Sequence, residues 1–358
     1  MSADNSTVAR SGPLLSIVIV NWNGERFLAP LFESITEQSF KEFEILFVDN
    51  GSKDGSVEFV RSDYPAFTII ENSENRGFAE ANNQGIERAT GEFILTLNND
   101  TVLEPLFLQS LMEAATSPDA SKERTGMWAP KILSLSLSKA SPDMIDSVGG
   151  LLLYPNGIGR GRGRMDSDSG QFDSLTEVLM PSACAGLYRR AMLDEIGLFD
   201  SDFFAYCEDT DLGLRARIAG WGALSVPGAV VRHYYSGTSG SHTPFKAYLV
   251  ERNHLWVAMK LFPFSSLLLF PFYEALRYLV QAKGVTSGVG ASAKLADELS
   301  FVGLIRIVLR AYAGAFIKLP SVLAKRRAVY KSARIPARQF KRLLRRYSIT
   351  ARELALKD

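Results

Sequence analysis

The first 115 residues alternate apolar runs with segments of helical periodicity, and this alternation restricts the possible folds more than any other feature. The runs at 15–22 (LSIVIVNW) and 43–50 (FEILFVDN) are dominated by apolar side chains and lack a regular polar alternation, as expected of strands buried on both faces. Similar runs follow at 67–72 and 93–100. Helical spacing separates each run from the next. The pattern predicts an α/β fold with an open, mostly parallel sheet flanked by helices.

Polar side chains gather where each of the four predicted strands ends. In open α/β sheets, ligands bind beyond the carboxyl ends of the strands. Turn chemistry explains single Asn, Asp and Gly residues at such places, but it explains less well why all four ends carry amides and carboxylates. We therefore predict a ligand rim at this edge of the sheet. Its members are Asn21, Asp49, Asn50, Asn75, Arg76, Asn98, Asn99 and Asp100.

Two common phosphate-binding motifs are absent from the sequence. No GxGxxG follows the first strand and no GxxxxGK[ST] occurs anywhere, so a Rossmann dinucleotide site and a P-loop are unsupported. The run at 157–164 (GIGRGRGR) has alternate glycines but precedes no clear helix. A mobile loop with Arg160, Arg162 and Arg164 facing solvent explains it at least as well as a phosphate cradle does.

Three acids follow an aromatic-rich segment at 198–213 (LFDSDFFAYCEDTDLG), namely Glu208, Asp209 and Asp211. A solvated helix start would also place acids here. However, the surrounding Phe, Tyr and Leu residues indicate that this turn packs into the protein. Carboxylates against an apolar wall bind protons more tightly and can act as general bases. We therefore predict a catalytic site in this segment.

Charge is divided unevenly along the chain. Residues 1–240 hold 19 basic and 33 acidic side chains, whereas residues 241–358 hold 21 and 6. Such asymmetry predicts that the basic part meets a polyanion or a membrane surface. The two cysteines, Cys184 and Cys207, form no disulfide framework or metal motif, and we interpret both as buried thiols in a reducing compartment. The first 13 residues lack the apolar core of a signal peptide.

The C-terminal part combines an apolar segment with a basic one. Residues 255–280 are the most apolar stretch, but their uncharged core at 261–273 has 13 residues, fewer than the roughly 20 that span a bilayer. Residues 299–350 contain 13 Lys and Arg and no acid. A solvated basic helix or a nucleic-acid patch would also explain this charge. The combination fits anionic lipid headgroups better, so we predict a membrane-surface partner through 255–350 and no nucleic acid.

Five motifs occur in one order along the chain, at 16–24 (SIVIVNWNG), 48–56 (VDNGSKDGS), 75–86 (NRGFAEANNQGI), 97–101 (LNNDT) and 183–215 (ACAGLYRRAMLDEIGLFDSDFFAYCEDTDLGLR). Together they resemble glycosyltransferase family 2, the inverting sugar-nucleotide transferases of the GT-A fold. The resemblance covers about residues 14–240 and is strongest to bacterial rhamnosyltransferase-like and galactofuranosyltransferase-like enzymes.

The resemblance implies roles for the rim. Asp49 would hydrogen-bond the nucleotide base, with Asn21 and Asn82 nearby. Asn98 would lie near the ribose, and Asp100 would hold a divalent cation bound to the diphosphate. The other rim residues named above would complete the nucleotide-sugar pocket.

The resemblance also assigns the acids and a metal ligand. Asp209 would be the catalytic base, with Glu208 and Asp211 positioning it or the acceptor. His233 would be a second ligand of the cation, which we expect to be Mg²⁺ or Mn²⁺. The NND sequence at 98–100 carries one carboxylate where many family members have two or three, which weakens the metal prediction.

These inferences give an expected domain plan and function. We expect a disordered segment at 1–13, a GT-A domain at 14–240 and a helical membrane-associating region at 241–358. Within the GT-A domain, 14–115 would bind the nucleotide and 116–240 would carry the acceptor and catalytic residues.

The resemblance implies a hexosyltransferase that takes a sugar from a nucleotide-diphospho-sugar and builds cell-surface polysaccharide. The donor hypothesis is dTDP-rhamnose, and the acceptor would be a glycan or a polyprenyl-linked sugar. We expect the protein on the cytoplasmic, inner face of the plasma membrane, with a homo-oligomer left open. The alternatives are a UDP-galactofuranose or UDP-hexose donor, or a non-catalytic sugar-nucleotide-binding subunit.

Overall fold

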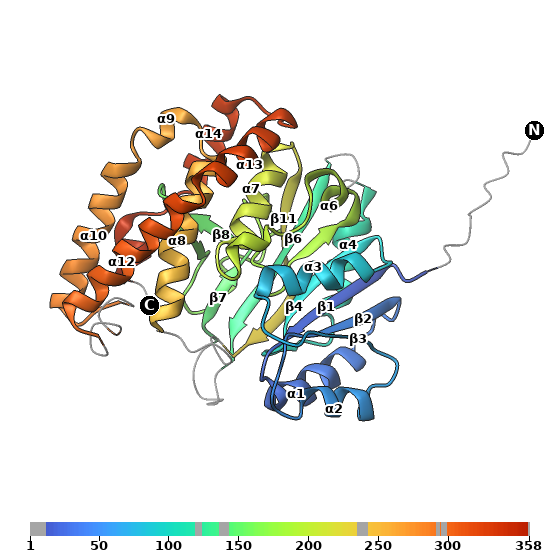
Figure 1. Cartoon of the computed structure of the whole chain (residues 1–358). Coiled ribbons are helices and arrows are strands. Elements are labelled where there is room, and N and C mark those ends of the chain that lie inside the picture. Colours follow the sequence, from blue (N-terminus) through green and yellow to red (C-terminus); the bar gives the residue numbers. More distant parts are fainter. Residues whose placement is uncertain are drawn as a thin grey trace, which may run out of the picture.

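The computed structural model describes residues 12–118, 124–135, 143–234, 243–290, 294 and 299–356. The segment expected to be disordered, 1–13, lies almost wholly outside the described residues. A curled sheet forms the centre of the molecule, and the C-terminal helices lie together on one side of it (Figure 1).

The strands follow the buried runs of the sequence closely in the first half of the chain. They are β1 (Leu15–Asn21), β2 (Phe43–Asp49), β3 (Thr68–Glu71), β4 (Phe93–Asn98), β5 (Thr101–Leu103), β6 (Thr125–Ser134), β7 (Ile145–Val148), β8 (Leu151–Leu153), β9 (Gly159–Gly161), β10 (Leu187–Arg189) and β11 (Gly222–His233).

The main sheet has the order β3-β2-β1-β4-β10-β6-β11-β5, with β7 paired to β6. Pairings from β3 to β4 are all parallel, as predicted. Beyond β4 the sheet is mixed, because β10 is antiparallel to both β4 and β6, and β11 is parallel to β6 but antiparallel to β5. The register aligns Asn21 with Asp49, so the carboxyl ends of β1 and β2 meet at one edge.

Helices cover both faces of the sheet. Those of the first 240 residues are α1 (Glu25–Thr36), α2 (Ser56–Asp63), α3 (Phe78–Arg88), α4 (Phe107–Thr116), α6 (Arg190–Ile196), the 3₁₀ helix η1 (Ser201–Phe203) and α7 (Glu208–Ile218). Leu28 of α1 and Phe107 of α4 belong to one buried core cluster. Ile86 of α3 and Leu212 of α7 belong to the cluster on the other face.

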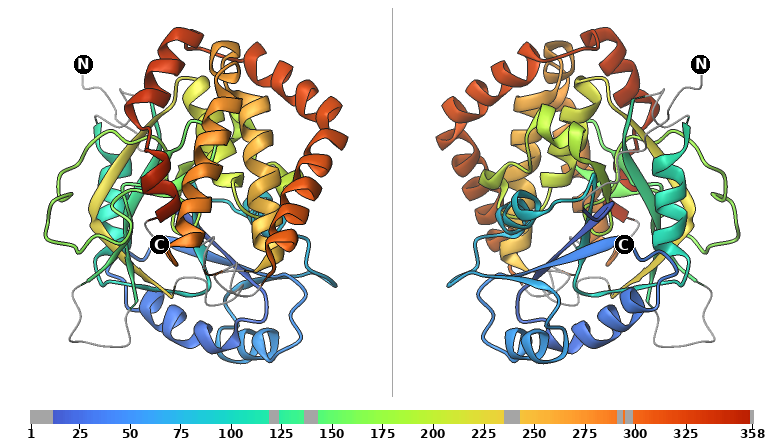
Figure 2. Two further views of the ribbon diagram at one scale, coloured as in Figure 1. Left: turned by 90° about the vertical axis from the view of Figure 1, so that its left-hand side faces the viewer. Right: turned by 90° about the vertical axis from the view of Figure 1, so that its right-hand side faces the viewer.

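The C-terminal region is helical, as predicted. It comprises α8 (Pro244–Leu261), α9 (Phe264–Leu267), α10 (Phe270–Thr286), α12 (Phe301–Ile317), α13 (Leu319–Lys331), α14 (Ala337–Arg346) and α15 (Ala351–Leu356). Helix α8 joins these helices to the sheet domain, because its Trp256 and Val257 are buried in the same cluster as α3 and α7. Figure 2 shows the C-terminal helices side by side over this face.

Two sequence-based interpretations are refined by the structure. The run at 157–164 contains β9, which pairs with β8, and is not a solvent-facing loop. Arg164 forms an ion pair with Asp146, and Arg160 donates to the carbonyl of Leu354 at 3.1 Å. The apolar segment at 255–280 is divided between α8, α9 and α10. Among the described residues, no helix is both long and apolar enough to cross a membrane.

Candidate active site

The ends of β1, β2 and β4 bring three rim residues into one hydrogen-bonded group. Asn21 Nδ2 donates to Asp49 Oδ1 at 3.2 Å, and Asn99 Nδ2 donates to Asn21 Oδ1 at 2.7 Å. All three side chains are buried. The backbone N–H of Ser52 donates to the second oxygen of Asp49 at 2.9 Å. The parallel register therefore produces the polar edge that the sequence predicts.

A second group fixes the turn before α3. Asn50 Nδ2 donates to Asn75 Oδ1 at 3.0 Å, and Asn50 Oδ1 accepts from the backbone N–H of Arg76 at 3.0 Å. The Arg76 side chain is exposed. Asn82 is buried within α3 and donates to its own helix at the carbonyl of Phe78, 2.9 Å away. Asn50, Asn75 and Arg76 thus belong to one turn, whereas the hydrogen bond of Asn82 is made within its own helix.

A third group gathers at the end of β4. His233, at the end of β11, lies with Nε2 3.3 Å from Asp100 Oδ1 and with Nδ1 2.8 Å from Asp146 Oδ2. Burial alone would lower the pKa of His233, but Cys184, Asp100 and Asp146 raise it well above its usual value. Burial raises the pKa of the adjacent Cys184 thiol. The cluster is therefore a buried set of carboxylate, imidazole and thiol groups.

This third group fits a divalent cation. Asn98 Oδ1 is buried and accepts no hydrogen bond from the described residues, and the buried Asp100 Oδ1 lies 3.3 Å from His233 Nε2. Oxygen ligands beside an imidazole are a donor set that suits Mn²⁺ or Mg²⁺. Asp146 contacts the other ring nitrogen of His233, which is how carboxylates orient metal-binding histidines. Asn98, Asp100 and His233 could thus hold a cation, with Asp146 supporting His233 from behind.

The loop before α7 is strained. Phe204, Tyr206 and Cys207 all have positive φ angles, of 67°, 69° and 66°. Side chains other than Gly rarely adopt this conformation, and such strain clusters at functional sites. Asn253 of α8 holds the loop, because its Nδ2 lies 2.8–2.9 Å from the carbonyl oxygens of Phe203, Ala205 and Tyr206.

Asp209 and Glu208 begin α7 directly after this loop. Asp209 Oδ2 accepts from the backbone N–H of Ala183 at 3.3 Å, and its Oδ1 accepts from that of Thr210 at 2.6 Å. Burial raises the pKa of Asp209. Burial and the neighbouring Asp209 raise the pKa of Glu208 still further above its usual value. Glu208 Oε2 also lacks a hydrogen bond from the described residues, so Glu208 holds its proton more readily than Asp209, which accepts two backbone hydrogen bonds.

The base candidate and the cation candidate are joined by two adjacent residues. Ala183 donates to Asp209, while the next residue, Cys184, contacts His233 and accepts at its carbonyl from the backbone N–H of Asn98 at 2.9 Å. The segment before β10 therefore brings the start of α7 next to the end of β4. The candidate base, the candidate cation ligands and the polar rim therefore lie around one region at the carboxyl edge of the sheet.

Two family models match most of this architecture. The model described as "Glycosyl transferase family 2" matches residues 16–124, and the one described as "Glycosyltransferase like family 2" matches residues 161–257. The first contains the polar rim and the second contains His233 and the acids of α7. The chain is a family 2 glycosyltransferase.

Curated relatives agree with this assignment. The glycosyltransferase is 25% identical over 285 residues to the N-acetylglucosaminyl-diphospho-decaprenol L-rhamnosyltransferase of Mycobacterium tuberculosis, a match that covers 68% of this chain and 86% of that protein. It is 27% identical over 213 residues to the uncharacterized glycosyltransferase YwdF of Bacillus subtilis, with 56% and 67% covered. It is 32% identical over 107 residues to the putative glycosyltransferase EpsH of Bacillus subtilis, but this match spans 29% of the chain and only 30% of EpsH.

A solved structure supports the fold. GalNAc-T7, in a crystal structure with UDP, GalNAc and Mn²⁺, aligns with a TM-score of 0.56 and 17% sequence identity, covering 75% of this chain and 52% of that one. The expectation of a GT-A fold, an α/β sheet flanked by helices, is confirmed.

Asp211 occupies a different environment from the other two acids of the glycosyltransferase. It is fully buried, and its two oxygens lie 2.7 Å from Arg215 Nε and 2.7 Å from Lys260 Nζ. These contacts tie α7 to α8. Because both oxygens are committed to ion pairs inside the protein, the predicted role in positioning the base can be exerted only through the backbone of α7.

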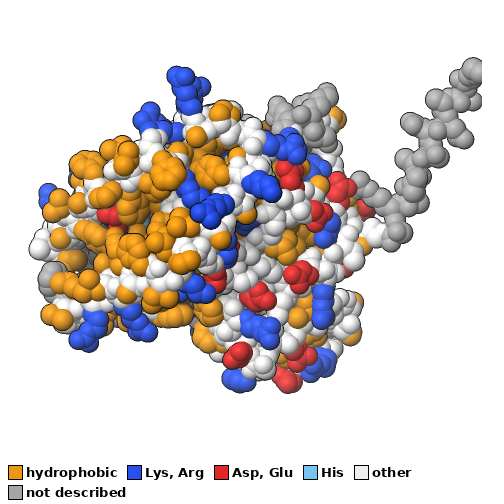
Figure 3. Space-filling model, turned by 45° about the horizontal axis from the view of Figure 1, so that its top comes forward, with side chains coloured by type: hydrophobic (Ala, Val, Ile, Leu, Met, Phe, Trp, Pro, Cys, Tyr) orange, Lys and Arg blue, Asp and Glu red, His pale blue; other side chains and the backbone are white. Residues whose placement is uncertain are grey.

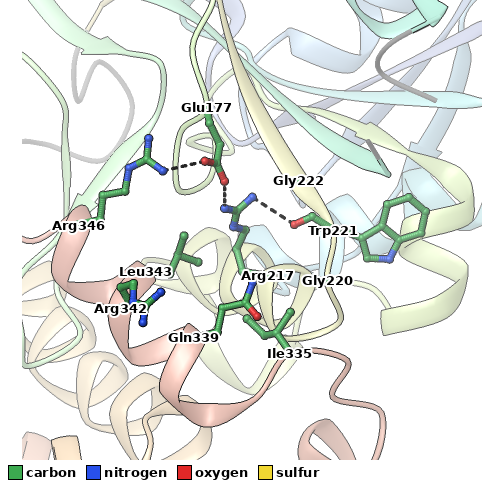
Figure 4. Close-up of a pocket in the computed structure, with 10 residues that line it drawn as sticks. All are labelled: Glu177, Arg217, Gly220, Trp221, Gly222, Ile335, Gln339, Arg342, Leu343 and Arg346. Atoms are coloured by element: carbon green, nitrogen blue, oxygen red, sulfur yellow. Dashed lines mark hydrogen bonds and ion pairs between the residues drawn. The ribbon is translucent and has the colours of Figure 1, made fainter. Parts of the chain in front are cut away.

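A cavity lined by residues of α7, β11 and α14 does not belong to this site. It has a volume of about 390 Å³ and lies beside α14, at the start of β11, whereas His233 lies at the other end of that strand. Figure 4 shows Glu177 between Arg217 and Arg346, to both of which it is ion-paired. These pairs connect α14 to the sheet domain.

A buried charge network lies among the C-terminal helices. Within the described ranges, Glu251, His254 and Glu274 are the one group of acids and histidines with ligand atoms close enough to share a metal, all within 4.8 Å. Arg277 already forms ion pairs with both glutamates, at 2.6 and 3.0 Å. The group is therefore an internal ion-pair network.

Three contributors to the site were missed by sequence reasoning. Asp146 had no motif, Cys184 was interpreted only as a buried thiol, and Asn253 lies in a segment considered for its apolar character. No local signal marks Asp146, since its partner His233 is 87 residues away. The loop at 204–207, which Asn253 contacts, is marked by positive φ angles. These angles are a property of the folded chain and cannot be read from the sequence.

Proposed function

We propose that this glycosyltransferase inverts the anomeric centre of a nucleotide-diphospho-sugar as it moves the sugar to a hydroxyl of a glycan or lipid-linked acceptor in cell-surface polysaccharide synthesis. The observation that carries this proposal is the position of Asp209. It is a half-buried carboxylate at the end of a strained loop, joined through Ala183 and Cys184 to the candidate cation ligands. An inverting transfer needs one base beside the leaving diphosphate.

In the proposed reaction, Asp209 takes the proton of the acceptor hydroxyl while the hydroxyl oxygen attacks the anomeric carbon. The new carbon–oxygen bond forms as the bond to the diphosphate breaks, and the nucleoside diphosphate leaves with the electron pair. Glu208, neutral because of its raised pKa, keeps a second negative charge away from the ionised base. Asp211 holds α7 against α8 and so fixes where the base lies.

The polar rim binds the nucleotide in this proposal. Asp49 accepts from the base, with its orientation fixed by Asn21 and Ser52. The turn of Asn50, Asn75 and Arg76 closes one side of the pocket. Asn99 lies toward the ribose, and Asn98 lies between the ribose and the cation. Asn82, on α3, would lie near the nucleotide base.

Asp100, His233 and Asn98 would hold Mg²⁺ or Mn²⁺. A bound cation supplies charge stabilisation for the leaving diphosphate. The support is the buried Asn98 Oδ1 without a hydrogen bond from the described residues, the buried Asp100 Oδ1 beside His233 Nε2, and the carboxylate behind His233. Because the NND sequence contains a single carboxylate, that of Asp100, cation affinity in this proposal depends strongly on His233.

The donor hypothesis is dTDP-rhamnose, because a relative matched over 86% of its length is named as a rhamnosyltransferase. UDP-galactofuranose and UDP-hexoses are the alternatives. A panel of sugar nucleotides, with nucleoside diphosphate release as the readout, tests the proposal. Release with dTDP-rhamnose above the others supports it, and preferential release with a UDP-sugar would replace the donor. Tight donor binding without release, with any acceptor, would favour a non-catalytic subunit.

We also propose that the protein lies on the inner face of the plasma membrane. Apolar side chains gather over the C-terminal helices in Figure 3. Leu268, Phe272, Leu279, Leu309 and Ile317 are 63–82% exposed, and apolar area on this scale marks an interaction surface. Lys and Arg lie around this area, which matches the charge of an anionic leaflet. Sedimentation with anionic vesicles tests this, and an L268S/L279S variant should sediment less.

A further inference from the structure

A small cavity lies between α9, α10 and α14, apart from the candidate active site. It has a volume of about 120 Å³, and its lining includes Tyr154, Tyr273, Lys341 and Arg345. A water molecule occupies about 30 Å³ in the liquid, so the cavity has room for roughly four waters, close to the size of one phosphate group. Helices α9 and α14 meet here, since Lys341 Nζ donates to Ser265 Oγ at 3.0 Å.

The lining of this cavity is cationic. It contains Lys341 and Arg345 and no acidic side chain. Arg345 is exposed, and its guanidinium has no hydrogen bond or ion pair with any described residue. The ammonium of Lys341 has three donors, of which the contact with Ser265 uses one. Two positive charges with free donors at one small cavity suit a phosphate, which Arg binds in a bidentate manner.

The larger cavity beside the same helix provides a contrast. There, Arg217 and Arg346 are both neutralised by Glu177. At the smaller cavity no carboxylate performs this function. The two faces of α14 therefore differ. One face is ion-paired to the sheet domain through Arg346, and the other presents Lys341 and Arg345, whose charges no carboxylate of the cavity neutralises.

Apolar side chains surround the cationic cavity on the outer surface. Phe264 is 78% exposed, Leu268 82%, Leu269 47% and Phe272 63%. Leu269 itself lines the cavity. Figure 1 places α9 and α14 next to each other at one end of the helical region. In a membrane interface the lipid phosphates lie just outside the acyl chains. Cationic side chains beside exposed apolar ones match this arrangement.

From this arrangement we propose that the cavity between α9, α10 and α14 binds the headgroup phosphate of an anionic membrane lipid through Lys341 and Arg345. Leu268 and Phe272 would enter the acyl region beside that phosphate. This inference rests on the membrane association proposed above and adds a defined lipid site to it. The site would hold the enzyme at the surface and is separate from the donor and acceptor site.

Sedimentation of the full chain with vesicles tests the site. The vesicles contain phosphatidylcholine alone or phosphatidylcholine with phosphatidylglycerol. K341Q/R345Q should lower partitioning onto the anionic vesicles about thirtyfold, given the usual energy of two basic side chains at an anionic surface. R327Q/R338Q is the matched control, because it removes the same charge from exposed arginines outside the cavity. The control should lose only a few-fold.

The outcomes separate the site from the general charge of the region. Equal losses in the two double variants would overturn the lipid site while leaving membrane association intact. If the wild-type chain fails to sediment with anionic vesicles, membrane association fails together with the site. A heat of inorganic phosphate binding that K341Q/R345Q abolishes, with vesicle partitioning unchanged, would assign the cavity to a soluble anion instead. Sugar transfer to a soluble acceptor tests the reaction independently and should be equal in both variants.

Discussion

The backbone N–H of Ala183 donates to Asp209 Oδ2 at 3.3 Å, which connects the start of α7 to the segment before β10. The next residue, Cys184, reaches His233, so the connection continues to the candidate cation ligands. A hydrogen bond from a backbone N–H to a carboxylate favours its ionised form, and here it opposes the effect of burial on the pKa of Asp209. The contact therefore orients the Asp209 carboxylate and favours its ionised form, as the proposed role of a base requires.

Glu208 and Asp209 should respond differently to loss of charge. Since the pKa of Glu208 is raised well above that of an ordinary glutamate, its side chain is neutral when Asp209 titrates, and Glu208→Gln resembles the native state. We expect this variant to keep kcat within a few-fold of wild type. In both proteins kcat/KM should fall as the pH drops through the raised pKa of Asp209, above the ordinary aspartate value. A loss of activity in Glu208→Gln as deep as that in Asp209→Asn would contradict this division of roles.

The carboxylate behind His233 should tune cation affinity. Asp146 lies 2.8 Å from His233 Nδ1. Loss of such a supporting carboxylate typically weakens metal binding or activity about 10–100-fold. We expect Asp146→Asn to raise by that factor the Mn²⁺ concentration needed for half-maximal transfer, with a parallel loss in Mn²⁺ affinity by calorimetry. Chelation by EDTA should abolish transfer in the wild type, and full activity after chelation would rule out the cation.

Asn253 should stabilise both the fold and the base. Its side chain is fully buried and donates to the strained loop before α7. Asn253→Ala leaves carbonyl oxygens unsatisfied, so the free energy of unfolding should fall by about 1–3 kcal/mol. Because the loop carries Asp209, kcat should fall more than KM rises. Gln109→Ala, at an exposed pair on α4, is the control, and an equal effect on kcat would refute a specific role for Asn253.

Asp200 should make stability depend on acid pH. Burial opposes its ionisation, but Lys260 and Lys325 lower the pKa of its carboxyl to about 2 from a reference value of 3.8. A lowered folded-state pKa adds stability above the unfolded value and loses it as the pH falls toward the folded one. About 2 kcal/mol of unfolding free energy should therefore disappear between roughly pH 4 and pH 2. Urea unfolding over this range measures it, and Asp200→Asn should flatten this part of the pH dependence.

Sequence patterns located the rim because its parts are local. Each of β1, β2 and β4 ends in its own polar residues, and parallel pairing alone brings Asn21, Asp49 and Asn99 together. The antiparallel insertion of β10 between β4 and β6 could not be derived in the same way. Ala183 and Cys184 lie in the segment just before β10, and the insertion of this strand places them at the site.

The acids of α7 show the same limit. Spacing grouped Glu208, Asp209 and Asp211, but their roles depend on partners from other elements. Lys260, on α8, forms a buried ion pair with Asp211, whereas Asp209 accepts a hydrogen bond from the backbone N–H of Ala183. A periodic pattern reports which residues share a helix, and it does not report what packs against each face.

Sugar transfer by Asp209→Asn is the most direct measurement of the central proposal. The substitution keeps the shape of the side chain and removes its ability to take a proton. Loss of a general base typically costs 10²–10⁴-fold, so kcat should fall by about that factor. Affinity for the nucleoside diphosphate and the free energy of unfolding should remain near the wild-type values. Transfer at the wild-type rate by a folded Asp209→Asn protein would contradict the assignment of Asp209 as the base.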